Sequence, residues 1–333
     1  MKKIHITTHA NLALIKYWGK RDEALLLPCT SSFGISLTAL KTTTTLYSHA
    51  ADEDLIQLDG NNNASLHIPI RKFFDGVRTR FGINTKFSIL SKNHFPTASG
   101  LASSASGFAA LALGVNSVCE LGLSMQEISV LARTGSGSAA RSIHGGVVLW
   151  HKGQALDGHD SFAQPMFNAS WWPELRVIIA VTTTQEKKIS SRAGATASKE
   201  TSSLYPGWLE RSKERLPKII EAVRVRNFHT MGQLAEADWT DMRDVMLDTK
   251  PSLNYWTEVS WAVINKIIAL REQSGLATYI TTDAGPHVKV LCLAPDAPRI
   301  QEELRTIPGV LSILESCVAD EPTIEEEYGN FIP

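Results

Sequence analysis

The sequence predicts an α+β protein, and three features indicate this class. The first third holds threonine-rich and short apolar stretches typical of strands, residues 95–114 lead from a loop of small residues into an apolar helix, and the end mixes strands with a helix. The opening is not a series of strand–helix–strand units, so a doubly wound parallel sheet is not expected.

The first third is dominated by strand and turn signals. Residues 41–47 carry four threonines and predict a strand, and residues 55–58 predict another that ends at an Asp-Gly turn. Apolar residues at helical spacing predict a helix over 69–80 with Pro69 at its start. Residues 85–90 predict a further strand.

The rest of the chain adds helices and a second group of strands. Ser124 and Glu127 have the spacing of a capping box, which predicts a helix that ends near Gly135. The remaining predictions are strands at 147–150 and 175–181, helices at about 191–203, 206–226, 228–238 and 255–273, a strand at 276–282, a turn at 284–286, a strand at 287–293, a helix at 296–306 and a strand at 310–316. This end resembles half of a ferredoxin-like fold. We expect two domains, 1–184 and 185–333, and a peripheral acidic tail.

Composition and net charge limit the classes of binding partner that the protein can have. The 333 residues include 33 Lys+Arg and 34 Asp+Glu, and 43% are apolar, which is typical of a globular protein. A net charge of −1 gives no field that would attract nucleic acid or an anionic membrane, so local groups must hold any anionic ligand. The scattered Cys29, Cys119, Cys292 and Cys317 and the lack of a signal peptide or membrane span favour a cytoplasmic protein.

A loop of small residues precedes the helix near residue 103. Its sequence, PTASGLASSAS at 96–106, lets a ligand approach the backbone, and the helix that follows directs its free N–H groups toward that ligand. The loop therefore predicts a phosphate site, although it is not a Walker A loop. Tight helix packing through small residues is the alternative.

Two further segments suggest chemistry. Residues 15–22, IKYWGKRD, combine three cations with two aromatic rings, which suits neutralisation of an oligophosphate away from water, while a solvated basic turn is the alternative. Asp283 lies between a β-branched strand and a Gly-Pro turn that would hold its carboxylate rigidly. Its alternative is a turn-forming aspartate that bonds its own backbone.

Read together with GSGSAARS at 135–142, these segments resemble the mevalonate diphosphate decarboxylases of the GHMP kinase superfamily. The resemblance covers almost the whole chain and rests on NLALIKYWGKRDEALLLP (11–28), FPTASGLASSAS (95–106), RTGSGSAARSIHGG (133–146), SSRAG…ETS (190–202) and TDAGPHVKV (282–290). It implies a two-lobed GHMP kinase fold, with a strand-rich N-terminal lobe, a ferredoxin-like C-terminal lobe and an active site in the cleft between them. His287 departs from the asparagine common in this family.

The resemblance also implies an activity and its residues. The reaction would be ATP-dependent decarboxylation of (R)-5-diphosphomevalonate to isopentenyl diphosphate, with ATP as co-substrate, Mg²⁺ and a homodimeric enzyme. No residue is assigned as a metal ligand. The catalytic residues would be Asp283, Lys16 and Arg141. Substrate would bind Tyr17, Trp18, Gly19, Lys20, Arg71, Ser136, Gly137, Ser138, Ala139, Ala140, Arg141, Ser191, Arg192 and Thr201. ATP would bind Pro96, Ser99, Gly100, Leu101, Ala102, Ser103, Ser104 and Lys187.

Physical chemistry supports the role of Asp283 as the base, and alternative functions remain open. A tertiary alcohol is too weak an acid for a carboxylate to ionise outright, so Asp283 should take its proton only as the phosphoryl group arrives. Because the protein as a whole is nearly neutral but would bind two oligophosphates, its cations must be concentrated at the site. We therefore expect one cleft to bring together Lys16, Lys20, Arg71, Arg141, Lys187 and Arg192. Action on mevalonate 5-phosphate, phosphorylation alone, and a catalytically silent ligand sensor remain alternatives.

Overall fold

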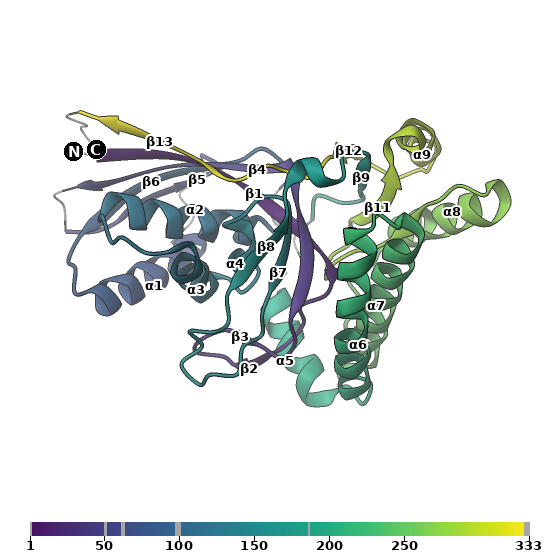
Figure 1. Cartoon of the computed structure of the whole chain (residues 1–333), viewed down its shortest axis with the longest axis horizontal. Helices are drawn as coiled ribbons and strands as arrows, with labels where there is room; N and C mark the ends of the chain where they lie inside the picture. Colours follow the sequence, from purple (N-terminus) through teal and green to yellow (C-terminus); the bar gives the residue numbers. More distant parts are fainter. Residues whose placement is uncertain (1, 50–51, 61–63, 97–100, 186, 330–333) are drawn as a thin grey trace.

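Two β-sheets with their helices divide the chain into two lobes (Figure 1). The computed structural model describes residues 2–49, 52–60, 64–96, 101–185 and 187–329. The strands are β1 (Lys2–Ile15), β2 (Lys20–Asp22), β3 (Leu27–Pro28), β4 (Ser32–His49), β5 (Leu55–Leu58), β6 (Lys86–Asn93), β7 (Val147–Trp150), β8 (Ala163–Phe167), β9 (Leu175–Val181), β10 (Tyr279–Ile280), β11 (Val288–Leu293), β12 (Ser312–Ser316) and β13 (Thr323–Tyr328). The helices are α1 (Ala64–Phe81), α2 (Ser103–Val118), α3 (Met125–Gly135), α4 (Ala139–Ser142), α5 (Ser191–Thr201), α6 (Tyr205–Arg224), α7 (Phe228–Asp248), α8 (Glu258–Ser274) and α9 (Ala297–Arg305).

The first sheet is built on two long strands, β1 and β4. Its order is β13-β1-β4-β6-β5, and β7 joins β4 and β8 at the other end of β4. Along the first half of β1 every second side chain is buried, so Ile4 and Ile6 pack inward while His5 and Thr7 face outward. Helices α1, α2 and α3 cover the buried face, as Figure 1 shows.

Several element bounds differ from the sequence predictions. Strand β1 was not predicted from the sequence, although Ile4 and Ile6 alternate with polar residues as in a half-buried strand. Helix α1 begins at Ala64, so Pro69 lies inside it rather than at its start. Helix α7 continues ten residues beyond 238, and β10 has only two residues. The capping box at Ser124 and Glu127 is confirmed.

The second sheet is antiparallel with the order β10-β11-β9-β12. Helices α5 to α8 lie between β9 and β10, and α9 lies between β11 and β12. With α5 to α8 counted as one helical segment, the order is β-α-β-β-α-β, which confirms the ferredoxin-like pattern. Strand β9, which the predicted boundary after residue 184 assigns to the first domain, pairs with β11 and β12 in this second sheet. The acidic tail is peripheral, as expected, and it forms the exposed strand β13, which pairs with β1 at the edge of the first sheet.

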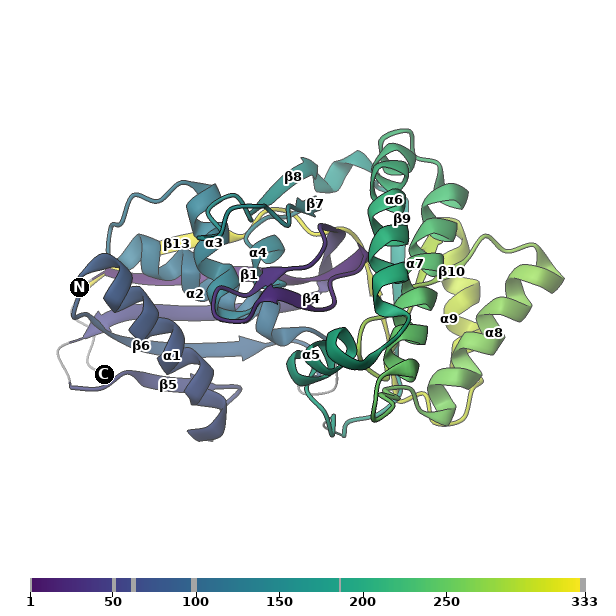
Figure 2. The ribbon, with the colours of Figure 1, turned by 90° about the horizontal axis from the view of Figure 1, so that it is seen from below.

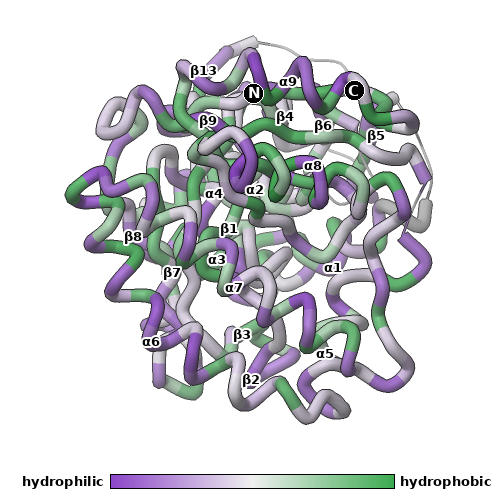
Figure 3. The backbone as a smooth tube through the Cα atoms, turned by 90° about the vertical axis from the view of Figure 1, so that its right-hand side faces the viewer, coloured by the Kyte–Doolittle hydropathy of each residue, from purple (hydrophilic) through white to green (hydrophobic). Residues whose placement is uncertain are grey.

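The lobes share a continuous core where they meet. Leu12 and Phe33 of the first sheet belong to the same buried cluster as Val177 of β9 and Met231 of α7. Figure 2 shows α5 at this junction, between the first sheet and helices α6 and α7. In Figure 3, α6 carries hydrophilic stretches, as expected for an outer helix. Within the described ranges, no helix is both long and apolar enough to cross a membrane.

Candidate active site

A cavity of about 440 Å³ opens between the two lobes. Its walls come from the end of β1, the start of α2, α4 and its preceding loop, the start of α5, and the turn after β10. The predicted site residues that line it are Lys16, Tyr17, Trp18, Gly19, Lys20, Leu101, Ala102, Ser103, Ser104, Ser136, Gly137, Ser138, Arg141, Lys187, Ser191, Arg192 and Asp283. The fold therefore brings most of the predicted site together from segments far apart in the sequence.

Asp283 is held between two lysines. Nζ of Lys16 donates to its Oδ1 at 3.1 Å, and Nζ of Lys289 donates to its Oδ2 at 3.2 Å. Both lysines are almost fully buried, while the Asp283 side chain is 28% exposed through the cleft. Burial alone would raise the pKa of the Asp283 carboxyl, but the charges of Lys16 and Lys289 outweigh it and hold that pKa well below its usual range. In the free protein Asp283 is thus an ionised hydrogen-bond acceptor that faces the cleft.

Lys16 is the first residue after β1, and three contacts fix it. Its Nζ donates to the carbonyl of Ala13 at 2.7 Å as well as to Asp283, and its backbone N–H donates to Oδ2 of Asp238 at 2.7 Å. Burial lowers the pKa of Lys16 to about 8, partly opposed by the charge of Asp283. Lys16 therefore stays mostly charged at neutral pH and loses its proton as the pH rises through about 8.

Arg141 lies on the one-turn helix α4 with its side chain buried. Its Nε donates to Oδ1 of Asn11 at 2.9 Å, and its Nη1 donates to the hydroxyl of Ser32. The guanidinium lies 5.9 Å from the ring centroid of Trp150. Burial lowers the pKa of Arg141 only to about 10, so the group remains a cation with its fork fixed in the wall of the cleft.

Tyr17 and Gly137 pack closely against each other in the wall of the cleft. A Cβ atom added to Gly137 would lie 2.5 Å from the Tyr17 hydroxyl, so a larger residue there would have to displace that hydroxyl. The Tyr17 ring packs edge-on against Trp150, with 4.7 Å between the ring centroids. Burial raises the pKa of the Tyr17 hydroxyl well above its usual value, which keeps it protonated as a hydrogen-bond donor.

The hairpin β2–β3 brings Lys20 and Gly19 to the cleft. Gly19 has φ of +93°, and an added Cβ would collide with the hydroxyl of Tyr205, which itself donates to the carbonyl of Trp18 at 2.8 Å. Nζ of Lys20 donates to Oε2 of Glu23 at 2.6 Å. Lys20 therefore has a carboxylate partner that an anionic ligand must share or displace.

Helix α2 presents an uncapped N-terminus to the cleft. Ala102, its N-cap residue, has left-handed backbone angles and makes no side-chain cap hydrogen bond. The first N–H groups and the dipole of this 16-residue helix are thus available for an anion. The hydroxyls of Ser104 and Ser136 lie 3.2 Å apart and connect this loop with the second glycine-serine loop.

The start of α5 and the segment before it add two cations, Arg192 and Lys187. Nζ of Lys187 donates to the hydroxyl of Ser191 at 2.8 Å and to the carbonyl of Ala284 at 2.9 Å. Burial lowers the pKa of Lys187 to about 8, and the charge of Lys289 adds to that shift. Nη2 of Arg192 donates to the carbonyl of Gly135 at 3.2 Å, so it reaches across to the first lobe.

Two predicted substrate residues lie away from the cleft. Arg71 is on α1 with a side chain that is 42% exposed, and its Nη1 lies 3.6 Å from a carboxylate oxygen of Glu53. Thr201 is the last residue of α5, where its hydroxyl donates to the carbonyl of Ala197 and accepts the N–H of Lys250. Neither side chain lines the cavity in this structure, so these two substrate assignments stay predictions.

Five other predicted residues do not line the cavity or lie outside the described part. Ala139 and Ala140 are the first two residues of α4, where they are buried in apolar clusters and do not line the cavity. Pro96 is not among the lining residues. Ser99 and Gly100 lie outside the described residues.

Sequence reasoning missed two buried charged residues that organise the site. Lys289 is 2% exposed in the apolar strand β11, and Asp238 is fully buried in α7. A lone lysine within the run HVKVLCL is a signal, since an unpaired lysine is rarely buried. His287 proves to be fully buried, and its Nδ1 accepts the N–H of Thr182 at 3.2 Å, so it supports the turn rather than lining the cleft. Burial lowers the pKa of His287 to about 3, so it is neutral.

Charge is segregated largely as expected. Five of the six cations predicted to converge on one cleft line it, and Arg71 is the exception. The acidic run 325–327 lies on β13, where Glu326 pairs with Lys2 at 2.8 Å and Glu327 with Lys3 at 3.0 Å. This run is thus an exposed edge strand with ion pairs rather than a free tail.

The donor set in the cleft fits magnesium that arrives with a nucleotide. In the part of the chain that the structure describes, no group of three His, Cys, Asp or Glu side chains could hold a metal ion by itself. The cavity instead offers the hydroxyls of Ser103, Ser104 and Ser136. Mg²⁺ commonly keeps several waters and binds through substrate phosphates with few protein oxygens, so these hydroxyls suffice.

Comparisons with known proteins show the family of the chain. Residues 8–163 match the model of the diphosphomevalonate decarboxylase-like N-terminal domain, and residues 177–328 that of the mevalonate 5-diphosphate decarboxylase C-terminal domain. The diphosphomevalonate decarboxylase of Homo sapiens is 37% identical over 306 residues, which cover 86% of this chain and 76% of the human one.

Solved structures give the same result. The crystal structure of mevalonate diphosphate decarboxylase from Staphylococcus aureus has 35% identity and a TM-score of 0.90, and the match covers 98% of this chain and 99% of that one. A structure of MDDEF in complex with MVAPP, AMPPCP and magnesium has 34% identity and a TM-score of 0.90, covering 98% and 100% of the two chains. The chain belongs to the mevalonate diphosphate decarboxylase family.

Proposed function

We propose that the chain converts (R)-5-diphosphomevalonate and ATP into isopentenyl diphosphate, ADP, phosphate and CO2, as part of isoprenoid precursor synthesis by the mevalonate pathway. The observation that supports this best is Asp283, an ionised carboxylate that faces a cleft whose other polar groups are mostly cations and hydroxyls. One base among groups suited to oligophosphates fits proton removal from an alcohol during phosphoryl transfer.

In the first step the C3 hydroxyl of the substrate attacks the γ-phosphorus of ATP. The bond from the C3 oxygen to phosphorus forms, the bond to ADP breaks, and the hydroxyl proton passes to Asp283. Because the alcohol is a weak acid, the proton moves as the phosphoryl group arrives. Lys16 and Lys289 keep the carboxylate ionised and oriented until then.

In the second step phosphate leaves C3 with the electron pair of its C–O bond. The electron pair between the carboxyl carbon and C2 becomes the new C2=C3 bond, and CO2 departs. Arg141 is the proposed partner of the substrate carboxylate, because its planar fork is buried, charged and fixed by Asn11 and Ser32. It thereby holds the carboxyl group in the geometry that cleavage requires.

The phosphate groups of the two substrates would be held by different walls. We assign the diphosphate of the substrate to the group Tyr17, Trp18, Gly19, Lys20, Ser136, Gly137, Ser138, Ser191 and Arg192. The ATP phosphates would lie at the start of α2, between residues 101–104 and Lys187. Magnesium, when bound with ATP, neutralises charge on its phosphates, and the hydroxyls of Ser103, Ser104 and Ser136 would hold it there.

Steady-state ADP release with each of two substrates tests this proposal. With 5-diphosphomevalonate we expect turnover that depends on both substrates. We also expect a kcat/KM at least tenfold higher than with mevalonate 5-phosphate, because Lys20 and Arg192 would bind the second phosphate group. A preference for the monophosphate would replace the proposed substrate. ATP turnover that does not depend on a second substrate, or none at all, would favour a ligand sensor.

We also propose a homodimeric, cytoplasmic enzyme with its domain boundary between β8 and β9. Exposed Leu55 and Leu90 on adjacent strands of the uncovered sheet face offer apolar surface to a second copy. The cysteines at 29, 119, 292 and 317 are all free, which suits a reducing compartment. Sedimentation analysis and cell fractionation test the two claims, and a concentration-independent monomer would refute the first.

A further inference from the structure

Behind the cleft, a buried aspartate holds the residue that carries the catalytic ammonium. Asp238 lies on α7 and is fully buried. Its Oδ2 accepts the backbone N–H of Lys16 at 2.7 Å, and its Oδ1 lies 3.5 Å from Nη1 of Arg215 on α6. The carboxylate therefore fixes the point where β1 ends and Lys16 turns toward Asp283.

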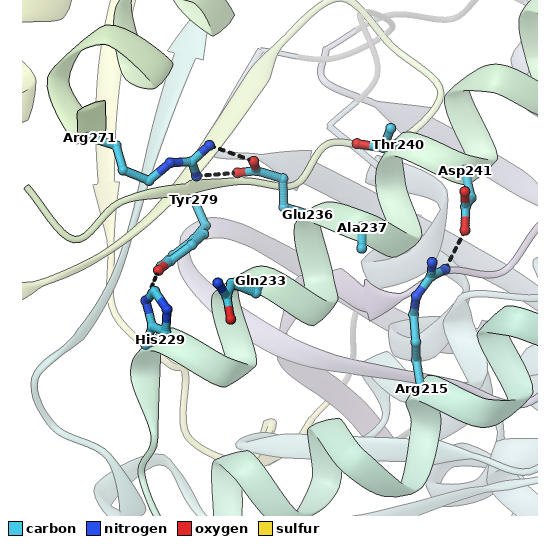
Figure 4. A pocket seen from close by; sticks show the side chains of 9 residues that line it. All are labelled: Arg215, His229, Gln233, Glu236, Ala237, Thr240, Asp241, Arg271 and Tyr279. Carbon is cyan, nitrogen blue, oxygen red and sulfur yellow. Dashed lines mark hydrogen bonds and ion pairs between the residues drawn. The ribbon is translucent and has the colours of Figure 1, made fainter. Parts of the chain in front are cut away.

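Arg215 connects this buried group with the outer surface. It lines a second cavity of about 460 Å³, bordered by α6, α7, α8 and β10 and drawn in Figure 4. There its Nη1 lies 2.6 Å from Oδ2 of Asp241, while Arg271 makes two hydrogen bonds of 2.9 Å with Glu236. The Arg215 side chain is 16% exposed, so its charge is accessible to solvent although Asp238 is not.

We propose that Asp238 is a positioning residue for Lys16, and that protonation of its carboxyl weakens this hold and slows the reaction at Asp283. The inference rests on the proposed function for its kinetic test, but its structural part concerns the Lys16 amide alone. Asp238 touches neither substrate, because it does not line the active-site cavity. It acts through Lys16.

The charges around Asp238 make this group sensitive to pH. Lys16 faces it from the end of β1, Arg215 and Arg211 from α6, and Asp241 lies one turn along its own helix. Burial raises the pKa of Asp238 to about 6, although the Lys16 N–H and the charge of Arg215 oppose this shift. As the pH falls through 6, the carboxylate becomes a neutral acceptor, and such a hydrogen bond is roughly half as strong.

The first test is spectroscopic and needs no turnover. In protein labelled with ¹⁵N-lysine, the amide resonance of Lys16 is assigned by its absence in Lys16→Arg. We expect this resonance to titrate with a midpoint near pH 6 in the wild-type protein and to stay constant in Asp238→Asn. An unchanged resonance between pH 5 and 7.5 in the wild type would overturn the inference even if the enzyme decarboxylates its substrate.

The second test reads kcat against pH. Wild-type kcat should fall about tenfold through pH 6, which corresponds to ~1.4 kcal/mol, while Asp238→Asn should show the lower value already at pH 7.5 and no step. Arg215→Met should move the step to higher pH, because it removes a charge that stabilises the carboxylate. Asp241→Asn is the matched control, since it contacts Arg215 but not Lys16, and it should retain the step.

The two proposals fail in different ways. If Asp238→Asn and Arg215→Met lower the melting temperature but leave the pH profile of the wild type, Asp238 is structural only and the inference is wrong. If the wild type releases no CO2 but the Lys16 amide titrates as expected, the proposed function is wrong and the placement of Lys16 by Asp238 stands.

Discussion

Replacement of Lys289 by methionine probes how Asp283 is held. Methionine fills much of the same volume without the charge, so Oδ2 of Asp283 loses the ammonium that now lies 3.2 Å away, while Lys16 remains on Oδ1. A hydrogen bond with a charged partner contributes about 1.5–3 kcal/mol. If that interaction serves to orient the base, kcat should fall by roughly ten- to a hundredfold.

The assay is steady-state ADP release with saturating ATP and 5-diphosphomevalonate. KM for both substrates should stay within about twofold of the wild-type value, because Lys289 does not line the cleft. Lys289→Arg keeps the charge and serves as the control, with a kcat closer to wild type than that of Lys289→Met. Wild-type kcat in Lys289→Met, or a loss that appears only in KM, would refute the reasoning.

Two further predictions concern binding. Lys16 and Lys187 lose protons as the pH rises through about 8, and bound phosphates should raise the pKa of both lysines again. Substrate affinity should therefore fall above pH 8, and binding at pH 8.5 should take up protons. Titration calorimetry in buffers of different ionisation enthalpy measures this proton uptake, and zero uptake would contradict the prediction. Gly137→Ala should raise KM for the diphosphate substrate about tenfold because its Cβ displaces the Tyr17 hydroxyl, whereas Gly76→Ala, with open space around it, should match wild type in the same assay.

Most of the residues that line the cleft could be predicted from short motifs, because each motif is a continuous stretch of sequence whose residue types suit one kind of ligand group. The loop at 101–104 reaches the cleft because it starts a helix, and Lys16 and Asp283 reach it because each follows a strand. Arg71, by contrast, does not line the cavity in this structure. It lies on a helix whose rotation decides where the side chain points, and no local signal in the sequence sets that rotation.

The groups that orient the catalytic residues could not be found from local sequence. Asp238 meets Lys16 across 222 positions of sequence, and this contact depends on how α7 packs against β1. Likewise, β9 ends the strand-rich half in the sequence, but its pairing with β11 and β12 places it in the second lobe. Long-range pairing of this kind follows from the packing of whole elements rather than from any single segment.

The central claim is that Asp283 is the base for a phosphorylation that leads to decarboxylation. A rapid-quench single turnover with substrate labelled at the carboxyl carbon tests it most directly, in the wild type and in Asp283→Asn, which keeps the shape of the side chain. We predict one CO2 and one phosphate for each ADP in the wild type, and a rate lower by about a thousandfold or more in Asp283→Asn with both substrates still bound. ADP formed without CO2, or a near-normal rate in Asp283→Asn, would contradict it.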